Sequence, residues 1–515
     1  MSASFNGNLF IALRERFPAD MNSAAVRVAD PAPGCPAVFS WRGLNEASAR
    51  IANLLESLDL PPGARVAMQA EKSVEALIVY LAVLRAGYVF LPLNPAYQAA
   101  EIEYFLEDAE PSVVVCPDKA LERVTALARE RDIAHVFSLN EDRTGTLLEA
   151  ARTHSSRHQH RKVRADDVAV ILYTSGTTGR CKGAMLTHGN LLGNTATLHD
   201  YWGWRSSDVL IHTLPIFHVH GLFVAAQGAL YSGAGMIWFN RFDAQAIVQR
   251  LPEATVFMGV PTLYVRMLQE SGLTQEACRN MRLFAAGSAA LLPDTFNRWR
   301  KRTGQTIVER YGMSETVMLT SNPYYAREGE RRAGTVGLPL PGVQLRITGG
   351  SAKPCRRGEI GGIEVRGPSV FKGYWRAPEL TAAAFTPDGW FSTGDLGLID
   401  ELGYVVILGR SKDLIISGGY NVYPAEVEGY LNELPGVAES AVIGVPHPDF
   451  GEAVVAVIVP EPGAAPDPAA LIAELKTRIA NFKVPKRMFV VEELPRNLMG
   501  KVQKALLRDR HKGLF

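Results

Sequence analysis

One stretch in the middle of the chain restricts the fold more than any other. Residues 168–173 form a short, continuous apolar run, and residues 174–183 after them are mostly Thr, Ser and Gly. A short apolar run without polar alternation is typical of a strand covered on both faces, as in the parallel sheets of α/β proteins. The sequence therefore predicts an α/β fold in which a polar, glycine-rich loop follows a buried strand.

Three later segments repeat this arrangement. Residues 254–260, 282–286 and 306–308 are also apolar, and each is followed at once by small, polar or special residues. In open α/β sheets, ligands bind beyond the carboxyl ends of the strands. Four such loops at four strand ends predict one shared binding site.

Two segments of the first half are predicted from local signals. Residues 73–87 read as a buried helix, with Ser73 at its start and Gly87 just past its end, where capping residues belong. Residues 153–164 are polar and basic without periodicity, and we predict an exposed connection. Its three histidines could form a metal cluster, but a solvated loop is favoured because no nearby Cys or carboxylate completes a ligand set.

The pattern changes near residue 410. A strand over 403–408 precedes a charged segment at 410–413, and a small α+β unit follows, with a helix that opens at Pro424, two strands, a helix over 469–480 and a last strand over 487–491. We predict a large N-terminal part of mixed sheets and helices (1–409), a hinge (410–413) and a small mobile C-terminal domain (414–515).

The overall composition excludes several classes of protein. The 515 residues carry 54 Lys and Arg against 53 Asp and Glu, which gives no support to a nucleic-acid or membrane-surface partner. Its five cysteines form no CxxC pair, and the start of the chain lacks the basic and apolar regions of a signal peptide. No apolar helix is long enough to span a bilayer. We therefore predict a soluble, cytoplasmic protein whose oligomeric state is open.

The loop after the first strand has the chemistry of a polyphosphate site. Its glycines let backbone N–H groups converge, its hydroxyls add donors, and Lys182 adds a positive charge. The Walker A pattern does not fit, because Cys181 precedes the lysine and Gly183 follows it. The alternative is a plain flexible turn. The residues expected to contact phosphate are Thr174, Ser175, Gly176, Thr177, Thr178, Gly179 and Lys182.

The sequence of this loop resembles that of the adenylate-forming superfamily, which includes acyl-CoA synthetases, adenylation domains of peptide synthetases and luciferases. Further motifs of that superfamily follow in the same order, at residues 311–316, 393–395, 409–413 and 495–501. The resemblance covers essentially the whole chain and implies the adenylate-forming enzyme fold. It also implies a two-step reaction with ATP, Mg²⁺ and coenzyme A, in which a carboxylate is first adenylated and a thiol then displaces AMP.

The resemblance assigns roles to individual residues. Thr316 would contact the α-phosphate and Glu315 would hold Mg²⁺, because a carboxylate beside phosphates needs a cation between them. Asp395 and Arg410 would bind the ribose and Tyr311 the adenine; without the motif order, Asp395 capping a turn and Tyr311 in the core would be favoured. The other nucleotide contacts implied are Gly287, Ser288, Ala289, Glu309, Arg310, Gly312 and Met313.

The C-terminal domain would supply the moving parts. Taken alone, Lys501 is a solvated lysine; by resemblance it is the catalytic lysine that bridges the carboxylate and the α-phosphate. Rotation about Lys412 would withdraw it and bring Gly418, Gly419 and Tyr420 to a tunnel for the thiol. Such gating by domain motion suits sequential chemistry.

The identity of the acid is predicted from Arg266. It lies in a helix that starts at Pro261, and an inward guanidinium there could pair with a second carboxylate, whereas an outward one would only be solvated. This segment, with the motif that contains His218, resembles malonyl-CoA synthetases, which implies a pocket of Arg266, Ser288, His218 and Met313 for malonate or a methyl-substituted malonate. Thr174 and His218 join Lys501 and Glu315 as expected catalytic residues, and His218 could instead gate the thiol tunnel.

Two other functions stay open at this point. The chain could be a CoA ligase for a monocarboxylic or aromatic acid, with Arg266 turned outward, or a stand-alone adenylation module that loads a carrier protein. No carrier domain follows Phe515, which favours free coenzyme A. Cys181 departs from the small or polar residue more usual in the loop, and we expect sensitivity to thiol reagents.

Overall fold

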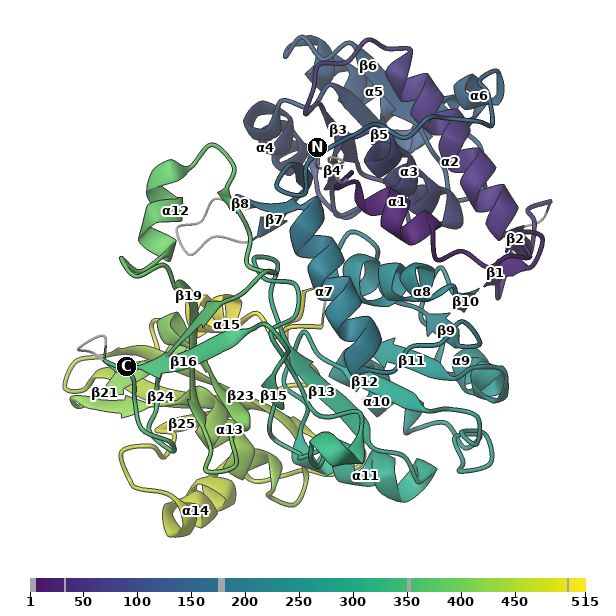
Figure 1. Ribbon diagram of the computed structural model, residues 1–515. Coiled ribbons are helices and arrows are strands. Elements are labelled where there is room, and N and C mark those ends of the chain that lie inside the picture. Colours follow the sequence, from purple (N-terminus) through teal and green to yellow (C-terminus); the bar gives the residue numbers. More distant parts are fainter. Residues whose placement is uncertain (1–5, 32–33, 175–180, 350–352, 498–499) are drawn as a thin grey trace.

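The computed structural model describes residues 6–31, 34–174, 181–349, 353–497 and 500–515 (Figure 1). In this part of the chain, two large sheets form the N-terminal portion, a four-stranded sheet follows, and a five-stranded sheet carries the C-terminal residues. Figure 1 shows the seven-stranded sheet in the upper half of the molecule and the C-terminal sheet at the lower left. The α/β class expected from the buried strands is confirmed.

The larger sheet has nine strands among the described residues, and its central six are parallel. In spatial order they are β15 (Leu338–Pro339), β14 (Thr320–Ser321), β13 (Ile307–Tyr311), β12 (Leu283–Ala286), β11 (Val256–Gly259), β9 (Val209–His212), β10 (Gly235–Trp238), β1 (Ala24–Val28) and β2 (Val38–Ser40). Four strands were predicted to be followed by loops of small and polar residues. Three of them therefore lie next to one another, as β11, β12 and β13.

The fourth predicted strand, β7, belongs to the other large sheet. This sheet comprises β18 (Gly373–Tyr374), β8 (Lys182–Thr187), β7 (Val168–Thr174), β4 (Val89–Pro92), β3 (Arg65–Met68), β5 (Val113–Cys116) and β6 (His135–Ser138). The loop between β7 and β8, which is the expected phosphate loop, lies largely outside the described residues. The shared site therefore has to form between two sheets.

Helices separate and cover these sheets in five layers. Alternate residues of each strand face opposite sides, so each sheet has two buried faces. One core lies between the sheets around α1 (Leu9–Arg14), α2 (Trp41–Glu56), α3 (Val74–Arg85), α7 (His188–Tyr201) and α8 (Gln227–Ser232). The outer faces pack on α9 (Ala244–Arg250), α10 (Pro261–Met267) and α11 (Pro293–Thr303), and on α4 (Ala99–Ala109) and α5 (Asp118–Arg129).

The helix expected over 73–87 forms as α3, and its caps are the predicted ones. The Ser73 hydroxyl accepts a hydrogen bond from the Ala76 N–H at 3.1 Å, and Gly87 adopts φ +71°. Burial of the whole helix between the sheets explains its nearly continuous apolar sequence. Among the described residues, no helix combines the length and the apolarity that a membrane crossing requires.

The expectation of an exposed connection over 153–164 is only partly right. The segment is irregular, but side chains of α2 and α3 hold its backbone, with Arg85 Nη2 donating to the His158 carbonyl at 3.1 Å. The His158 side chain is fully buried, and burial lowers the pKa of His160 to about 4. Sequence periodicity carries no trace of this, because the contacts are side chain to backbone. No three His, Cys, Asp or Glu side chains form a metal-binding group in the described part of the chain.

The C-terminal residues form a sheet of their own. Its strands are β22 (Tyr420–Val422), β21 (Ile415–Ser417), β24 (Gly451–Pro460), β23 (Val437–His447) and β25 (Arg487–Val490), packed on α13 (Pro424–Asn432), α14 (Pro468–Arg478) and α15 (Lys504–His511). Before it comes the antiparallel sheet of β16 (Gln344–Thr348), β17 (Gly361–Arg366), β19 (Phe391–Ile399) and β20 (Val405–Arg410), with α12 (Pro378–Ala384) beside it; α6 (Thr146–Arg152) completes the helices named.

Candidate active site

The end of β20 and the adjacent β19 bring three predicted nucleotide residues together. The strands are antiparallel with Asp395 opposite Arg410, and the Asp395 carboxylate pairs with the Arg410 Nε at 2.7 Å. The Tyr311 hydroxyl donates to the other carboxylate oxygen. Burial raises the pKa of Asp395 while Arg410 opposes the rise. This edge therefore holds a carboxylate, a guanidinium and an aromatic ring in one fixed unit.

Glu315 lies close to the phosphate loop. Its carboxylate is 5% exposed and accepts a hydrogen bond from the Tyr374 hydroxyl at 3.1 Å. The Lys182 ammonium lies 5.2 Å from the centre of the same tyrosine ring. Because β18, which contains Tyr374, pairs with β8, this ring joins the end of the loop to Glu315.

Sequence reasoning missed Tyr374. Its segment carries no periodicity or motif signal, so only the pairing of β18 with β8 reveals its position. The two described ends of the phosphate loop lie at the expected place, with Thr174 at the end of β7 and Lys182 at the start of β8. Five other predicted phosphate contacts lie outside the described residues: Ser175, Gly176, Thr177, Thr178 and Gly179.

Burial raises the pKa of Cys181, which argues against the expected sensitivity to thiol reagents, since the thiolate is the reactive form.

The turn after β13 places Thr316 and Met313 beside Glu315. Thr316 is fully buried, and its hydroxyl accepts a hydrogen bond from the Met313 N–H at 3.3 Å. Gly312 is required here, because a Cβ at this position would meet the Val317 carbonyl oxygen at 1.9 Å. The turn is therefore closed by its own hydrogen bonds, since the Thr316 N–H also donates to the Met313 carbonyl at 3.1 Å.

Two consecutive charged residues occupy the buried strand β13. Glu309 and Arg310 are 4% and 2% exposed, and they point to opposite faces of the sheet, so they do not pair with each other. One Glu309 oxygen accepts from the Leu291 N–H at 2.9 Å, while the Glu309 Oε2 and the Arg310 Nε and Nη2 lack partners in the described structure. Burial raises the pKa of Glu309 to about 8 and lowers that of Arg310 to about 9.

Arg310 packs beneath the loop that follows β12. A Cβ on Gly287 would lie 2.4 Å from the Arg310 Nη1, so only glycine permits this approach. Ser288 next to it has φ +71°, a left-handed conformation that is strained for a serine. Its hydroxyl lies 3.4 Å from the His220 Nδ1, and Ala289 beside it is half-buried. The loop is thus fixed over a buried guanidinium.

Two histidines lie near the same guanidinium. The His218 Nδ1 accepts the His220 backbone N–H at 3.3 Å, which leaves the ring proton of a neutral His218 on Nε2. Burial, Lys501 and Arg310 together lower the pKa of His218 to about 3. His220 begins a π-helical turn, His220–Ala226, and is fully buried. His218 is therefore a neutral hydrogen-bond donor near the unpaired arginine.

Lys501 reaches this pocket from the C-terminal domain. Its backbone N–H donates to the Asn497 side chain at 3.0 Å, and Arg496 donates to the Gly500 carbonyl at 2.6 Å, so the lysine loop is internally braced. Lys501 as a whole residue is exposed. Burial of the ammonium group lowers the pKa of Lys501 most, and Arg410 and Arg310 lower it further, while Asp395 and Glu315 oppose this.

Other predicted residues of the C-terminal domain lie away from this pocket. Lys412 is exposed in the turn Ser411–Asp413. Gly418 and Gly419 are exposed with φ +58° and +83°, and Tyr420 is 59% exposed and stacks on Phe482 of the same domain. In this conformation they form no tunnel wall.

Arg266 is exposed in this structure rather than turned inward, and its contact with the second carboxylate stays a prediction. The side chain is exposed and lines the open space between the domains. The helix α10 explains this, because Tyr264 and Met267 face the core and a residue two after Tyr264 falls on the opposite side at 100° per residue. The buried guanidinium beside Ser288 is Arg310. Two adjacent charges inside an apolar strand were a signal available in the sequence.

The described residues fit a magnesium ion shared with a nucleotide. Mg²⁺ in phosphoryl-transfer sites is commonly held by one or two carboxylates and by substrate phosphates rather than by a protein cage. Glu315 offers one buried carboxylate beside the phosphate loop, and Tyr374 occupies one of its oxygens. That donor set suits Mg²⁺ only when phosphates complete it.

Comparisons with known proteins agree with this geometry. The sequence model of a family described as "AMP-binding enzyme" matches residues 22–375, and one described as "AMP-binding enzyme C-terminal domain" matches residues 426–501. A malonate–CoA ligase of Arabidopsis thaliana is 36% identical over 478 residues, which cover 87% of this chain and 78% of the relative. A feruloyl-CoA synthase of an Amycolatopsis species is 36% identical over 504 residues, covering 95% and 99%.

Among solved structures, ATP-bound MatB from Rhodopseudomonas palustris shares 50% identity over 99% of this chain and 100% of its own, with a TM-score of 0.95. The apo structure of the same protein, with the same identity and coverage, superposes with a TM-score of 0.84. The described fold, including the placement of the C-terminal domain, is thus similar to that of the ATP-bound relative.

Proposed function

Because the chain belongs to the AMP-binding enzyme family, we propose that it is an ATP-dependent, AMP-forming ligase that joins malonate, or a methyl-substituted malonate, to coenzyme A. One malonate carboxylate oxygen attacks the α-phosphorus of ATP and pyrophosphate leaves. The thiol of coenzyme A then attacks the acyl carbon of the adenylate, and AMP leaves with the electron pair of the broken bond.

The observation that carries the choice of acid is the unpaired Arg310. A buried charge without a partner costs several kcal/mol. An acid with a second carboxylate supplies the missing anion, whereas acetate or an aromatic monoacid leaves the guanidinium alone. Sites built on such a polar group reject analogues that lack the partner by roughly 10⁴-fold. The Ser288 hydroxyl, 3.4 Å from His220, lies on the same wall and can orient that second carboxylate.

Adenylation takes place between this pocket and the nucleotide edge. Lys501, which carries its charge between Arg310 and Asp395, neutralises the negative charge that develops when the carboxylate attacks the α-phosphate. Neutral His218 can donate a hydrogen bond from its Nε2–H to the reacting carboxylate and keep the proton. Glu315 would hold Mg²⁺ together with the ATP phosphates, and the ion would supply further neutralisation of their charge.

The nucleotide is oriented by the pre-assembled edge. Asp395 is already held by Arg410 and Tyr311, so it can accept hydrogen bonds from the two ribose hydroxyls without rearrangement. Thr174, Lys182 and Thr316 are the residues proposed to contact the phosphates. The turn at 410–413 is the proposed hinge, and rotation there would replace Lys501 by the exposed Gly418–Gly419–Tyr420 hairpin for the second step.

The test is release of AMP with five acids in parallel. We expect coenzyme A-dependent AMP formation with malonate and methylmalonate, and little with succinate, acetate or benzoate. If benzoate or acetate is the best substrate, the enzyme is a ligase for a monocarboxylic acid and the diacid proposal fails. AMP formation that needs a carrier protein and does not depend on coenzyme A would favour the loading module.

A cytoplasmic location is part of this proposal. All five cysteines are free thiols, as a reducing compartment allows.

A further inference from the structure

Helix α4 lies against the two strands between which the phosphate loop runs (Figure 1). It begins with a capping box, in which the Glu101 carboxylate accepts from the Gln98 backbone N–H at 2.8 Å. Tyr104 and Asp108 are four residues apart, so they lie on one face of the helix. That face is turned toward the end of β7 and the start of β8.

Both residues of this face bind the strand ends. The Tyr104 hydroxyl donates to the Cys181 carbonyl at 2.7 Å, and Cys181 directly precedes Lys182, the first residue of β8. The Asp108 carboxylate accepts from the hydroxyl of Tyr173, the last residue but one of β7. The helix therefore holds β7 and β8 where the phosphate loop starts and ends.

The end of the same helix is tied to the strand that carries Tyr374. The Asp108 backbone carbonyl accepts from the Trp375 indole N–H at 3.0 Å, and the Trp375 backbone N–H donates to the Gly183 carbonyl at 2.7 Å. Carbonyls in the last turn of a helix have no partner within the helix, so a donor from elsewhere satisfies one of them. Trp375 therefore connects α4 to β8 and fixes the adjoining Tyr374, whose hydroxyl donates to Glu315.

The contact between Tyr173 and Asp108 is partly shielded from solvent. Both residues are half-buried, and the Tyr173 ring packs on that of Phe105 with 4.6 Å between the ring centres. Burial raises the pKa of Tyr173 most, and the hydrogen bond to Asp108 raises it further. The hydroxyl therefore keeps its proton at neutral pH and stays a donor. A hydrogen bond to a charged acceptor contributes more than one between neutral groups.

We propose that Tyr104 and Asp108 are positioning residues that hold Lys182 and Glu315 in place for the β- and γ-phosphates of ATP and their Mg²⁺. The inference rests on the proposed function, which requires ATP. Tyr104 fixes the peptide bond that precedes Lys182, and Asp108 acts through Trp375 on the strand that adjoins Glu315. Groups that are already in place need no ordering when the charged phosphates bind. The nucleoside binds at a different edge, formed by β19 and β20, so the helix should not affect it.

The experiment removes both contacts from the full-length protein as Y104F/D108A. We expect the Kd for MgATP, measured by calorimetry without an acid, to rise roughly tenfold to a hundredfold, the usual cost of two hydrogen bonds of which one has a charged acceptor. The Kd for AMP, which has neither a β- nor a γ-phosphate, should stay within about twofold. A merely structural role would weaken the binding of both nucleotides alike. In malonate-dependent ATP–pyrophosphate exchange, the KM for ATP should rise and the KM for malonate should not.

Single variants keep the test decisive if the double variant folds poorly. Y104F removes one oxygen atom and should raise the Kd for MgATP about fivefold. D108N keeps a carbonyl oxygen that can accept from the Tyr173 hydroxyl, so it should restore most of the MgATP affinity that D108A loses. Thermal melting reports the folding of each variant.

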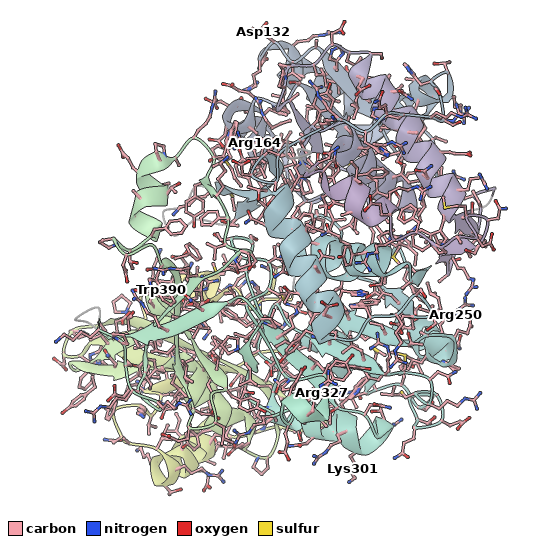
Figure 2. The ribbon with its side chains drawn as sticks, in the orientation of Figure 1. Asp132, Arg164, Arg250, Lys301, Arg327 and Trp390 are labelled. Carbon is pink, nitrogen blue, oxygen red and sulfur yellow. The ribbon has the colours of Figure 1, made fainter. Side chains whose placement is uncertain are left out.

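Matched controls remove the same kinds of group elsewhere. Y404F deletes a hydroxyl that donates to the Glu330 carbonyl at 2.7 Å, the same length as the Tyr104 contact. W390F replaces a half-buried tryptophan next to β19, labelled in Figure 2, and is compared with W375F. Both controls should keep the Kd for MgATP within about twofold. W375F should raise this Kd, and it should also raise the Mg²⁺ concentration that gives half of the maximal exchange rate.

The outcomes separate the two proposals. An unchanged Kd for MgATP in Y104F and in D108A, or an equal loss of MgATP and AMP binding, overturns the positioning role and leaves the ligase standing. Absence of malonate-dependent exchange in a wild-type protein that binds MgATP overturns the proposed ligase instead.

Discussion

Two arginines at opposite ends of the site, the partly exposed Arg410 and the buried Arg310, differ in their partners. Arg410 has Asp395 at 2.7 Å and donates to the Thr393 carbonyl at 3.3 Å. Arg310 has two nitrogens with no partner in the described structure. Because an unpaired buried charge is costly, the first end is complete before any ligand arrives, whereas the second becomes complete only with an anion.

Strand pairing explains the difference. Asp395 lies directly opposite Arg410 in the β19–β20 ladder, so the partner is supplied by register alone. Arg310 lies opposite Ser321 in β14, and the neighbouring strand β12 ends at Ala286, with Gly287 after it, so neither side offers a carboxylate. The paired end suits uncharged ribose hydroxyls, and the unpaired end suits a carboxylate.

Removal of the unpaired charge should have the largest effect. In R310Q we expect kcat/KM for malonate to fall by roughly 10³ to 10⁴, because the second carboxylate would be desolvated without a partner. Activity with acetate should fall much less, so the ratio between the two acids should collapse. The measurement is AMP release with both acids over a range of concentrations.

A matched control for R310Q is R331Q. Arg331 is also largely enclosed but donates to the Pro323 and Thr306 carbonyls, away from the pocket. Its loss should lower stability without changing the malonate-to-acetate ratio. If R310Q also preserves that ratio, the contrast between the two arginines has no bearing on specificity.

Lys501 lies between the two ends and should give the next largest effect. K501A should slow malonate-dependent ATP–pyrophosphate exchange by roughly 10² to 10³, the usual cost of losing one group that stabilises transition-state charge. Thioester formation from pre-made malonyl-adenylate should stay within about threefold, because the lysine is withdrawn in that step under the domain-rotation hypothesis. Equal loss in both half-reactions would contradict two separate uses of the site.

A smaller, thermodynamic effect concerns Glu309, on the opposite face of the same strand. Its folded pKa of about 8 lies above its ordinary value of 4.5, so between these values the folded state binds a proton that the unfolded state releases. The stabilisation from this carboxyl is complete at low pH and is lost as the pH rises toward 8. The variant E309Q keeps a carbonyl oxygen that can accept from the Leu291 N–H. Its side chain does not ionise, so its stability lacks this dependence on pH.

Thermal melting of both proteins at pH 5 and pH 8 measures this. The wild type should lose about 2 °C or more relative to E309Q as the pH rises, which corresponds to about 1 kcal/mol in a protein with domains of this size. If the melting temperature of the wild type instead rises relative to that of E309Q between pH 5 and pH 8, Glu309 is ionised in the folded protein.

The comparison also shows what the sequence could predict. Buried apolar runs predicted β7, β11, β12 and β13, and the caps Ser73 and Gly87 predicted α3, because these signals act within a few residues. The resemblance implied Asp395, Arg410 and Tyr311 as one nucleotide site, and the structure brings them into contact.

Contacts between distant segments could not be predicted in this way. The pairing of β18 with β8 brings the Tyr374 hydroxyl to the Glu315 carboxylate, and neither segment carries a sequence signal that predicts this contact. The inward orientation of Arg266 was implied by the resemblance to malonyl-CoA synthetases. In the structure Tyr264 and Met267 face the core, and Arg266 is exposed. The hairpin at Gly418–Tyr420 depends on the position of a whole domain.

The smallest expected effect concerns Arg266. R266Q should change the KM for malonate in ATP–pyrophosphate exchange by less than about threefold, because an exposed charge is screened by water and contributes at most about 1 kcal/mol. Measured beside R310Q with the same acid, it decides which guanidinium binds the second carboxylate. A loss as large as that of R310Q would show that Arg266 turns inward when malonate is bound and shares the anion.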